Sequence, residues 1–325
     1  MKKYLILLSV AALALVSCAK VKDVYTGSPE SRQIAFSPLA QPATKAAISD
    51  GVFPTSSKMY VAAYDATAGA PLFDATEFSY SSGTLWTGGK SWPLSPARIN
   101  FLAYAEFQGE TASWATPNAS GVTLTMTDNR TAQKDLIYAI GSGSVTQNAN
   151  STLQFPDYVS MTFQHAQAWI TFNANATESS SNKVTVNYIK LNGASYSGTF
   201  AVSVSNYNTN SPSVSGSWTS VGDAPGDGAT ITGPNSAISY AATGNGTAIG
   251  NGLLIVPKPA ESDFTSFTIN YTLAGKTYDY TYTPESTAVV AGSKYTYNIV
   301  FSLHDIAISA GVSSWTTPTG INVSL

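Results

Sequence analysis

The residue types that most often carry out chemistry at neutral pH are scarce in this chain. It contains one cysteine, Cys18, and two histidines, His165 and His304. A single cysteine cannot form a disulfide within the chain or a cysteine-based metal cluster. Both histidines lie in or at the end of strand-like patterns, and no GxSxG, HExxH or phosphate-cradling glycine motif accompanies them. We therefore expect structural histidines, no catalytic centre, no metal site and no cofactor.

Cys18 is instead placed for lipid modification. Two lysines at the start precede an apolar run over 5–16, and the stretch "LVSC" ends this run with a small residue before the cysteine. A basic start and a short apolar core are typical of a secretory signal peptide, and the core is too short to span a bilayer. We expect residues 1–17 to be the signal peptide, Cys18 to carry the lipid and 18–32 to be a linker. Two or three acyl chains, at about 0.8 kcal/mol per buried CH₂, would hold the protein on a membrane.

A candidate site for proteolytic cleavage follows the first strand-like segment. "QIAFSPLAQPATKAAISDG" (33–51) places two strand-like pieces around an exposed-looking loop with one basic residue, Lys45. A trypsin-like protease hydrolyses the bond after a basic residue, here between Lys45 and Ala46. An ordinary first hairpin with a linker is the alternative.

The piece before that loop has an apolar face. Ile34 and Phe36 share one side of the strand, and Pro38 limits pairing beyond them, as on an edge strand. If the two side chains are buried, their loss would expose surface worth about 1.5–3 kcal/mol each. The loss would also leave backbone donors and acceptors unpaired, which is the condition for adding a strand from another chain.

The composition describes a surface with few charges. Charged residues make up 11% of the chain and the net charge is −3. No basic cluster is present, so we expect no nucleic-acid partner. Ser, Thr, Asn, Gly and Tyr replace the charges, which is typical of extracellular β-proteins, and the 43% hydrophobic share is ample for packed cores.

Alternation of apolar and polar residues recurs along the chain and predicts strands. "GVTLTMTD", "RINFLAYAEF", "GTFAVSVS" and "KYTYNIVFSL" each place apolar residues at every second position, and "SFTINYTLAGKTYDYTY" (266–282) predicts a hairpin. Only "TAQKDLIYAI" (131–140) has a hint of helix. The stretch 205–250 predicts extended surface loops with one or two edge strands, including "SGSWTSV". Many short strands without amphipathic helices predict an all-β fold of sandwiches or barrels. We expect two domains, 33–157 and 158–325.

Two further features are weaker candidates for ligand binding. "DAPGDGATITGPN" (223–235) offers oxygen ligands and glycines to Ca²⁺, but it lacks the acidic density of an EF-hand loop, and a turn-rich loop is the alternative. Six tryptophans and 18 tyrosines could form a platform for sugars. Trp114 and Trp218, in loop-like settings, are the candidates for exposure, with core packing as the alternative.

Six segments, loosely specific alone, form a pattern through their order and spacing. They are "SWPLSPARINFLAY" (91–104), "KDLIYAIGSGSV" (134–145), "VSMTFQHAQAWITF" (159–172), "IKLNGASYSGTF" (189–200), "LLIVPKP" (253–259) and "GSKYTYNIVFSLHDIAISAGVSSW" (292–315). Together they resemble the fimbrillin family, the lipoprotein-precursor subunits of type V pili in Bacteroidales, over roughly 33–325. The resemblance implies two tandem transthyretin-like Greek-key β-sandwiches. It also implies a lipidated precursor that is cut after its first strand and accepts an extended segment of a neighbouring subunit.

The donor of that segment is expected in the C-terminal region, 306–325. Two alternating stretches there could supply it, and an ordinary last hairpin that completes the second sandwich is the alternative. Their apolar positions are Ile306, Ile308, Ala310 and Val312 in the first stretch and Ile321, Val323 and Leu325 in the second.

The cut site departs from the family's pattern. The family commonly has Arg followed by a small residue, whereas this chain has Thr44-Lys45-Ala46. Lysine carries the charge but not the planar guanidinium fork, so an arginine-selective pocket discriminates against it. Cutting at the nearest arginine, Arg32, would leave the first strand attached. Either a protease of broader basic specificity acts at Lys45, or the subunit keeps its strand and lipid as an anchor.

The resemblance implies a structural, non-enzymatic subunit of a fimbria at the cell surface, lipidated at the outer membrane as a precursor. Its partners would be copies of itself or related subunits, and an adhesive role toward a host glycan or protein is part of this expectation. The alternative is a lipid-anchored surface protein that does not polymerise, either a pilus anchor or a glycan-binding module.

Overall fold

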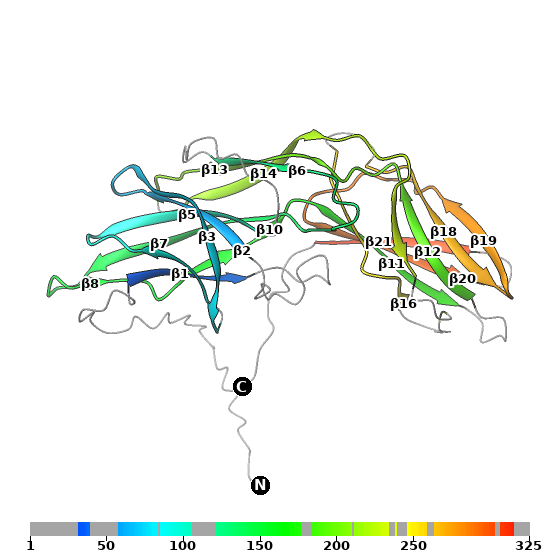
Figure 1. Ribbon diagram of the computed structural model, residues 1–325, viewed down its shortest axis with the longest axis horizontal. Coiled ribbons are helices and arrows are strands. Elements are labelled where there is room, and N and C mark those ends of the chain that lie inside the picture. Colours follow the sequence, from blue (N-terminus) through cyan, green and yellow to red (C-terminus); the bar gives the residue numbers. More distant parts are fainter. Residues whose placement is uncertain are drawn as a thin grey trace, which may run out of the picture.

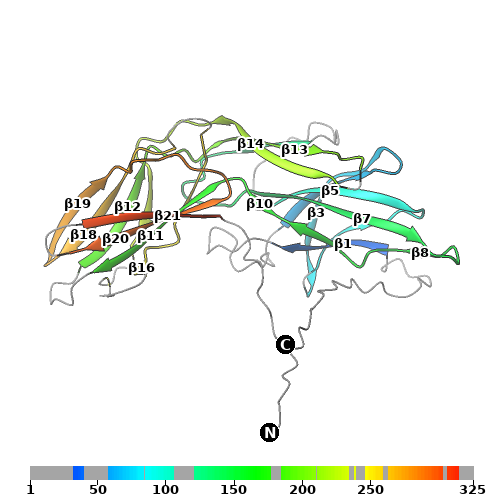
Figure 2. The same cartoon turned by 180° about the vertical axis from the view of Figure 1, so that it is seen from behind.

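In the computed structural model every regular element is a β-strand, within the part of the chain that the structure describes. That part comprises residues 32–39, 58–83, 85–105, 121–176, 184–209, 211–233, 238, 246–258, 263–302 and 306–314. These ranges contain no helix of the length and apolar character needed to cross a membrane. The strands form two lobes side by side in an elongated molecule (Figure 1; Figure 2 from behind).

The first lobe is built on a nine-stranded sheet. Its order is β10-β7-β5-β2-β3-β4-β1-β9, and β8 pairs with β7. The strands are β1 (Gln33–Leu39), β2 (Lys58–Asp65), β3 (Ala70–Ser82), β4 (Leu85–Ser91), β5 (Ala97–Ala105), β7 (Ile137–Gln147), β8 (Leu153–Gln154), β9 (Val159–Thr162) and β10 (Gln164–His165). Every pair in this sheet is antiparallel except β1 with β9.

This sheet folds over on itself. Strands β7 and β9 are far apart in the sheet order, yet a Cβ atom added to Gly141 of β7 would collide with Val159 and Met161 of β9. Glycine is therefore needed at this close approach. The core of the lobe lies inside the fold and contains Phe36, Phe78 and Phe101, all with 0% exposure, among its aromatic residues.

A three-stranded sheet, β14-β13-β6, covers the other face of the β5–β7 region. It consists of β6 (Gly121–Met126), β13 (Gly198–Ser205) and β14 (Ser213–Val221). Strand β6 pairs with β13 along its whole length, although more than 70 residues separate them in the chain. A second core lies between this sheet and the nine-stranded one, where Phe200 packs between Tyr138 and Trp218. This pairing ties the later part of the chain onto the first lobe.

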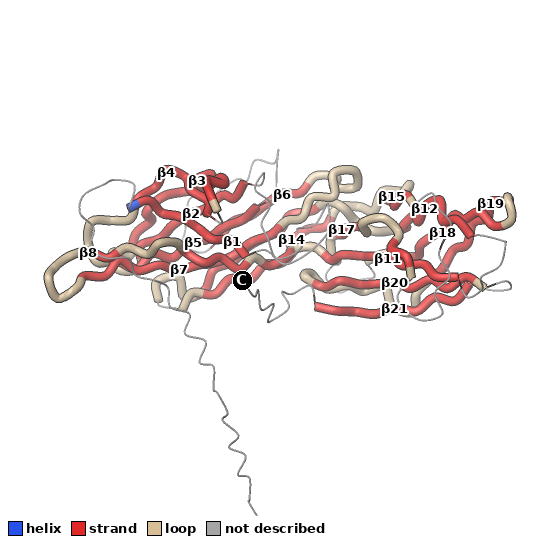
Figure 3. Tube along the Cα trace, turned by 90° about the horizontal axis from the view of Figure 1, so that it is seen from below, coloured by secondary structure: helices blue, strands red, loops and turns tan. Residues whose placement is uncertain are grey.

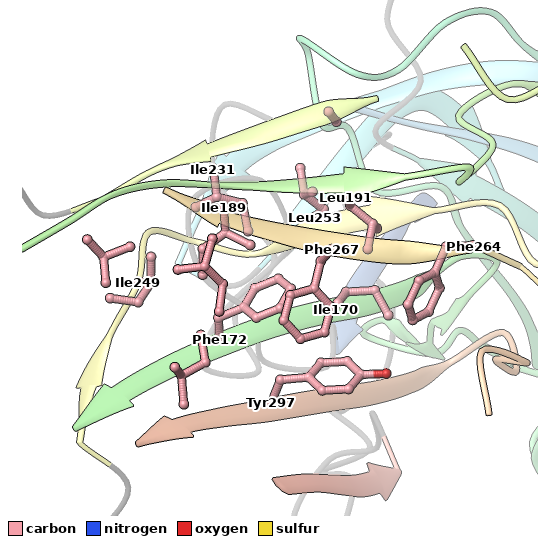
Figure 4. Packing of buried hydrophobic residues seen from close by; sticks show 14 of the residues in the cluster. Ile170, Phe172, Ile189, Leu191, Ile231, Ile249, Leu253, Phe264, Phe267 and Tyr297 are labelled. Carbon is pink, nitrogen blue, oxygen red and sulfur yellow. The ribbon is translucent and has the colours of Figure 1, made fainter. Parts of the chain in front are cut away.

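The second lobe consists of two sheets packed face to face (Figure 3). One has the order β16-β11-β20-β21, with β17 on β11, and the other is β15-β12-β18-β19. The strands are β11 (Ala168–Ala176), β12 (Val184–Asn192), β15 (Ala229–Thr232), β16 (Thr247–Ala248), β17 (Leu253–Ile255), β18 (Ser266–Leu273), β19 (Lys276–Tyr282), β20 (Ser293–Phe301) and β21 (Ile306–Ser314). Figure 4 shows the core between the sheets, where Phe267 lies 4.9 Å from Phe172 and 5.0 Å from Tyr297 between ring centroids.

The structure confirms the hairpin expected over 266–282. Strands β18 and β19 pair in register from Phe267 with Tyr282 to Leu273 with Lys276. The two loop residues have positive φ, 51° at Ala274 and 77° at Gly275. Two positive φ angles are the mark of a type I′ turn, whose twist matches that of the strands.

The hint of helix over 131–140 was wrong, because this segment forms a turn and then enters β7. The edge strand expected at "SGSWTSV" is confirmed, since these residues lie in β14, at the edge of the three-stranded sheet. The stretch 205–250 also contains β15 and β16, so it holds one strand more than the one or two that the sequence predicted.

The division of the chain at residues 157 and 158 stays a prediction. On the C-terminal side of that division, β9 pairs with β1 and β10 pairs with β7 of the first sheet. Strand β11 is the first to pair within the second lobe.

The core phenol of Tyr297 makes the second lobe sensitive to alkali. Burial, with smaller effects of Tyr282 and Tyr295, raises the pKa of Tyr297 to about 12. Because an unfolded tyrosine ionises near pH 10, the unfolded state releases its proton first, and folding free energy is lost as pH rises from about 10 to 12. Tyr297→Phe should lose less stability over this range, measured as the urea midpoint against pH. The exposed Tyr158→Phe is the control, and equal pH profiles for Tyr297→Phe and the unaltered protein would contradict the prediction.

Candidate functional site

The first strand lies between two neighbours in the sheet. Residues Gln33 to Phe36 pair antiparallel with β4, and Phe36 to Leu39 pair parallel with β9. The sequence predicted an edge strand because of Pro38, and this was wrong. Pairing with β4 ends at Phe36, before the proline, and pairing with β9 on the opposite side continues past it. β1 therefore joins β9 to the rest of the sheet.

The side chains of β1 are buried as the alternation predicted. Ile34 and Phe36 both have 0% exposure and belong to the core of the first lobe. The Phe36 ring meets Phe78 at 4.8 Å and Phe101 at 5.1 Å between centroids, edge to face in both cases. Such pairs contribute about 0.5–1.5 kcal/mol beyond their buried area. Ala35, on the opposite side of the strand, is also buried at 6% exposure.

Hydrogen bonds hold the start of β1. The backbone N–H of Trp92 donates to the carbonyl of Arg32 at 2.8 Å, and the side-chain Nη2 of Arg32 donates to the carbonyl of Trp92 at 3.2 Å. Trp92 is 1% exposed and packs against Phe101, with centroids 5.6 Å apart. These contacts anchor the backbone one residue before the strand begins.

The residues expected to be processed lie outside the described part of the chain. These are the lipidation candidate Cys18 and the cleavage candidates Lys45 and Ala46. The description of β1 ends at Leu39, six positions before Lys45.

Taking β1 away would open a groove in the first lobe. The cavity left by Ile34 and Phe36 would have the rings of Phe78 and Phe101 at its floor. Its rims would be β4 and β9, each with backbone groups that now bond to β1. An extended segment that alternates apolar and polar residues is the ligand that such a groove can bind.

The first half of the expected donor region forms β21, at the edge of a second-lobe sheet. It pairs with β20 along its whole length. Ile306 and Ile308 are half-buried against the second core, while Val312 is 65% exposed. Ile321, Val323 and Leu325 lie outside the described residues. The structure thus places β21 in the last hairpin, the arrangement named as the alternative to a donor, with part of its apolar face uncovered.

His165 is a hydrogen-bonded strand histidine, as expected. Its Nδ1 lies 2.8 Å from Oδ2 of Asp135, and the two residues are 4% and 0% exposed. His304 lies outside the described residues. The described part of the chain contains no group of three His, Cys, Asp or Glu residues that could hold a metal ion.

The weaker ligand-binding candidates have structural contacts. Trp218 has the core packing that was set against exposure, because it is 6% exposed and its Nε1 donates to the carbonyl of Ala166 at 2.7 Å. In the segment 223–235, Asp227 forms an ion pair with Arg130, which also pairs with Asp128. Trp114 lies outside the described residues.

Comparisons with known proteins identify the family. A sequence profile described as "Fimbrillin-like" matches residues 44–315, and the chain belongs to this family. A solved structure described as a "putative cell adhesion protein", from Bacteroides ovatus ATCC 8483, has a TM-score of 0.52 at 13% identity and covers 88% of this chain and 99% of its own. A fimbrial protein from Bacteroides vulgatus ATCC 8482 has a TM-score of 0.44 at 13% identity, over 88% and 100%. A comparison with curated protein sequences found no match.

The packing of Phe36 predicts a large effect of its removal. Phe36→Ala should destabilise the full-length chain by about 3–5 kcal/mol, because the cavity beside Phe78 and Phe101 cannot close fully. Phe36→Asp should cost more, since it would bury an unpaired charge. Urea unfolding measures both. The control is Leu94→Ala, at a position with 68% exposure, which should stay within about 0.5 kcal/mol of the unaltered protein. An unchanged midpoint for Phe36→Ala would contradict the packing described above.

Proposed function

We propose that this protein is a structural subunit of a cell-surface fimbria, assembled by proteolytic removal of β1 and its replacement by a strand from another subunit. The observation that carries the proposal is the complete burial of Ile34 and Phe36 in a strand that ends six residues before Lys45. A strand this well packed leaves a specific vacancy when it is removed. The fimbrillin-like family match over residues 44–315 supports the role of a fimbrial subunit.

The arrangement of the lobes favours a filament. β1 lies in one lobe and the candidate donor strand β21 lies in the other (Figure 1). If β21 of one copy binds in the groove of a second copy, each subunit donates a strand from one lobe and accepts a strand in the other. When the two contacting surfaces of a subunit are different, each added copy leaves a free surface for the next one. Such contacts produce an open filament unless the rotation between copies closes them into a ring.

The remaining parts of the proposal concern domains, export and location. We assign the two lobes to tandem transthyretin-like Greek-key sandwiches, with the first passage between them after β10, because β9 and β10 pair within the first sheet. Cys18 would carry the lipid of the precursor and hold it on the outer membrane before cleavage. Other subunits would be its partners, and an adhesive role belongs to the assembled fimbria.

A subunit that keeps β1 is the second candidate, and the identity of residue 45 favours it. The family commonly has arginine before the cut, and an arginine-selective pocket would bind the lysine ammonium less well. Such a subunit would stay lipidated and act as an anchor at the base. The glycan-binding alternative loses one of its two aromatic candidates, because Trp218 is buried.

Limited proteolysis tests the proposal. Trypsin treatment of the folded precursor should produce a chain that starts at Ala46, identified by mass, and the trimmed protein should then form ladders on a gel. Lys45→Ala is the control and should yield neither product. Lys45→Arg should be trimmed faster by an arginine-selective protease. A precursor that is trimmed fully at Lys45 and remains monomeric would overturn the polymerising role, and resistance at Lys45 would favour the anchor.

A further inference from the structure

A polar cleft lies at the end of β14, the edge strand of the three-stranded sheet over the first lobe. Its volume is about 340 Å³, and its lining runs from Trp218 to Ala224 and includes Lys258, which follows β17 of the second lobe. Binding sites for small molecules begin at about 300 Å³. We propose that this cleft binds one neutral sugar unit of a glycan. The site deepens the adhesive role within the proposed function and rests on that function only for its place on a fimbria.

A β-bulge lies in the wall of the cleft. Across the β13–β14 pairing Phe200 lies opposite Trp218, and the next pair is Thr199 with Ser220, so Thr219 is the extra residue of β14. A bulge interrupts the regular row of backbone groups along a strand and re-aims the side chains beside it. An extended peptide cannot pair continuously across this point, whereas a compact ligand with hydroxyl groups can bond to the exposed Thr219 and Ser220. The bulge therefore favours a sugar over a peptide strand.

Two side chains of opposite charge line the cleft. Asp223 is exposed and Lys258 is half-buried, and neither belongs to an ion pair among the described residues. A carboxylate only accepts hydrogen bonds and an ammonium group only donates them, whereas a hydroxyl group does both. Neighbouring hydroxyls of a sugar can therefore donate to Asp223 while another accepts from Lys258. Because the two charges balance, the cleft favours a neutral sugar over an acidic one.

Hydrogen bonds hold the two walls of the cleft in place. Ser195, with 0% exposure, donates from Oγ to the carbonyl of Gly222 at 2.7 Å, and its own carbonyl accepts the backbone N–H of Val256 at 2.9 Å. Two residues further on, the backbone N–H of Lys258 donates to Oδ1 of the buried Asp263. One serine thus connects the β14 wall to the segment that carries Lys258. A site that is already ordered loses less entropy when its ligand binds.

Trp218 positions the strand and does not stack on the sugar. Its Nε1 donates to the carbonyl of Ala166, and its ring packs on Phe200 with centroids 5.0 Å apart. The indole therefore fixes the strand beside the bulge from the core side, and hydrogen bonds alone hold the ligand. Such binding is weak for one sugar unit. In a fimbria many copies of the site act together, so that the avidity exceeds the affinity of one site.

Glycan binding by the uncleaved full-length chain tests the proposal. The probes are oligosaccharides that end in a neutral hexose, in fucose or in sialic acid, and a peptide with the sequence of β13 (198–205). A neutral probe should bind, and Asp223→Ala and Lys258→Met should each weaken its binding about tenfold, which corresponds to about 1.4 kcal/mol. Asp223→Asn should shift the preference toward the sialic acid probe, because the cation then has no opposing charge.

Matched controls change charges at other strands. Asp74→Ala in β3 and Lys276→Met in β19 alter exposed side chains outside the cleft and should bind like the unaltered protein. Urea midpoints are measured for every variant, and the exposed positions predict changes within about 0.5 kcal/mol. A loss of binding at an unchanged midpoint then belongs to the cleft and not to unfolding.

The outcomes separate this inference from the proposed function, because binding is measured before any cleavage. If no neutral probe binds, or if Asp223→Ala and Lys258→Met bind as tightly as the unaltered protein, the sugar site is overturned while the trimmed chain can still form ladders. Binding of the β13 peptide in place of the sugars would assign the edge of β14 to strand addition and would also overturn the site. A precursor that binds a neutral sugar through these two residues but never polymerises after trimming would support the site and overturn the polymerising role.

Discussion

The first lobe depends on one strand that is held from both sides. β1 pairs with β4 through its first half and with β9 through its second half, while two of its side chains are completely buried. In the described sheet β9 is hydrogen-bonded to β1 alone along its length. The removal of β1 would therefore break the sheet between β4 and β9 and open the core at the same place. A vacancy of this kind has a defined shape and two rows of backbone partners, unlike a general loss of packing.

A second constraint ties the lobes together. Strand β6 belongs to the first part of the sequence and β13 and β14 to the second, yet the three form one sheet over the first lobe. The tip of the β13–β14 hairpin is also held, because Asn100 donates from Nδ2 to the carbonyls of Tyr207 and Thr209, and Tyr64 packs edge to face on Tyr207. Because β13 and β14 lie between β12 and β15 in the sequence, the chain passes between the lobes three times, after β10, after β12 and after β14.

On the outer faces of the second lobe, uncharged polar side chains pair with one another, in keeping with the low share of charged residues in the chain, 11%. Side chains of equal type meet across neighbouring strands, as Thr171 does with Thr296 at 2.9 Å and Asn173 with Asn298 at 3.0 Å. These pairs satisfy each other's hydrogen-bonding groups without charge and contribute about 0.2–1 kcal/mol each. They form because β11 and β20 lie in register, which is a consequence of the core packing on the opposite face.

The sequence by itself determined the all-β class, the hairpin over 266–282, the structural role of His165, and the inward face of Ile34 and Phe36. Each follows from a local pattern, because alternation and turn residues act over a few positions. The tertiary structure decided what these strands meet. Only the fold shows that β1 has two neighbours despite Pro38 and that β9 and β10 belong to the first sheet. Only the fold shows, too, that Trp218 of β14 is buried in the core between the three-stranded sheet and the first lobe. These features depend on contacts between residues tens of positions apart in the sequence. The alternation of residues along one strand does not specify which strand pairs with it in the sheet.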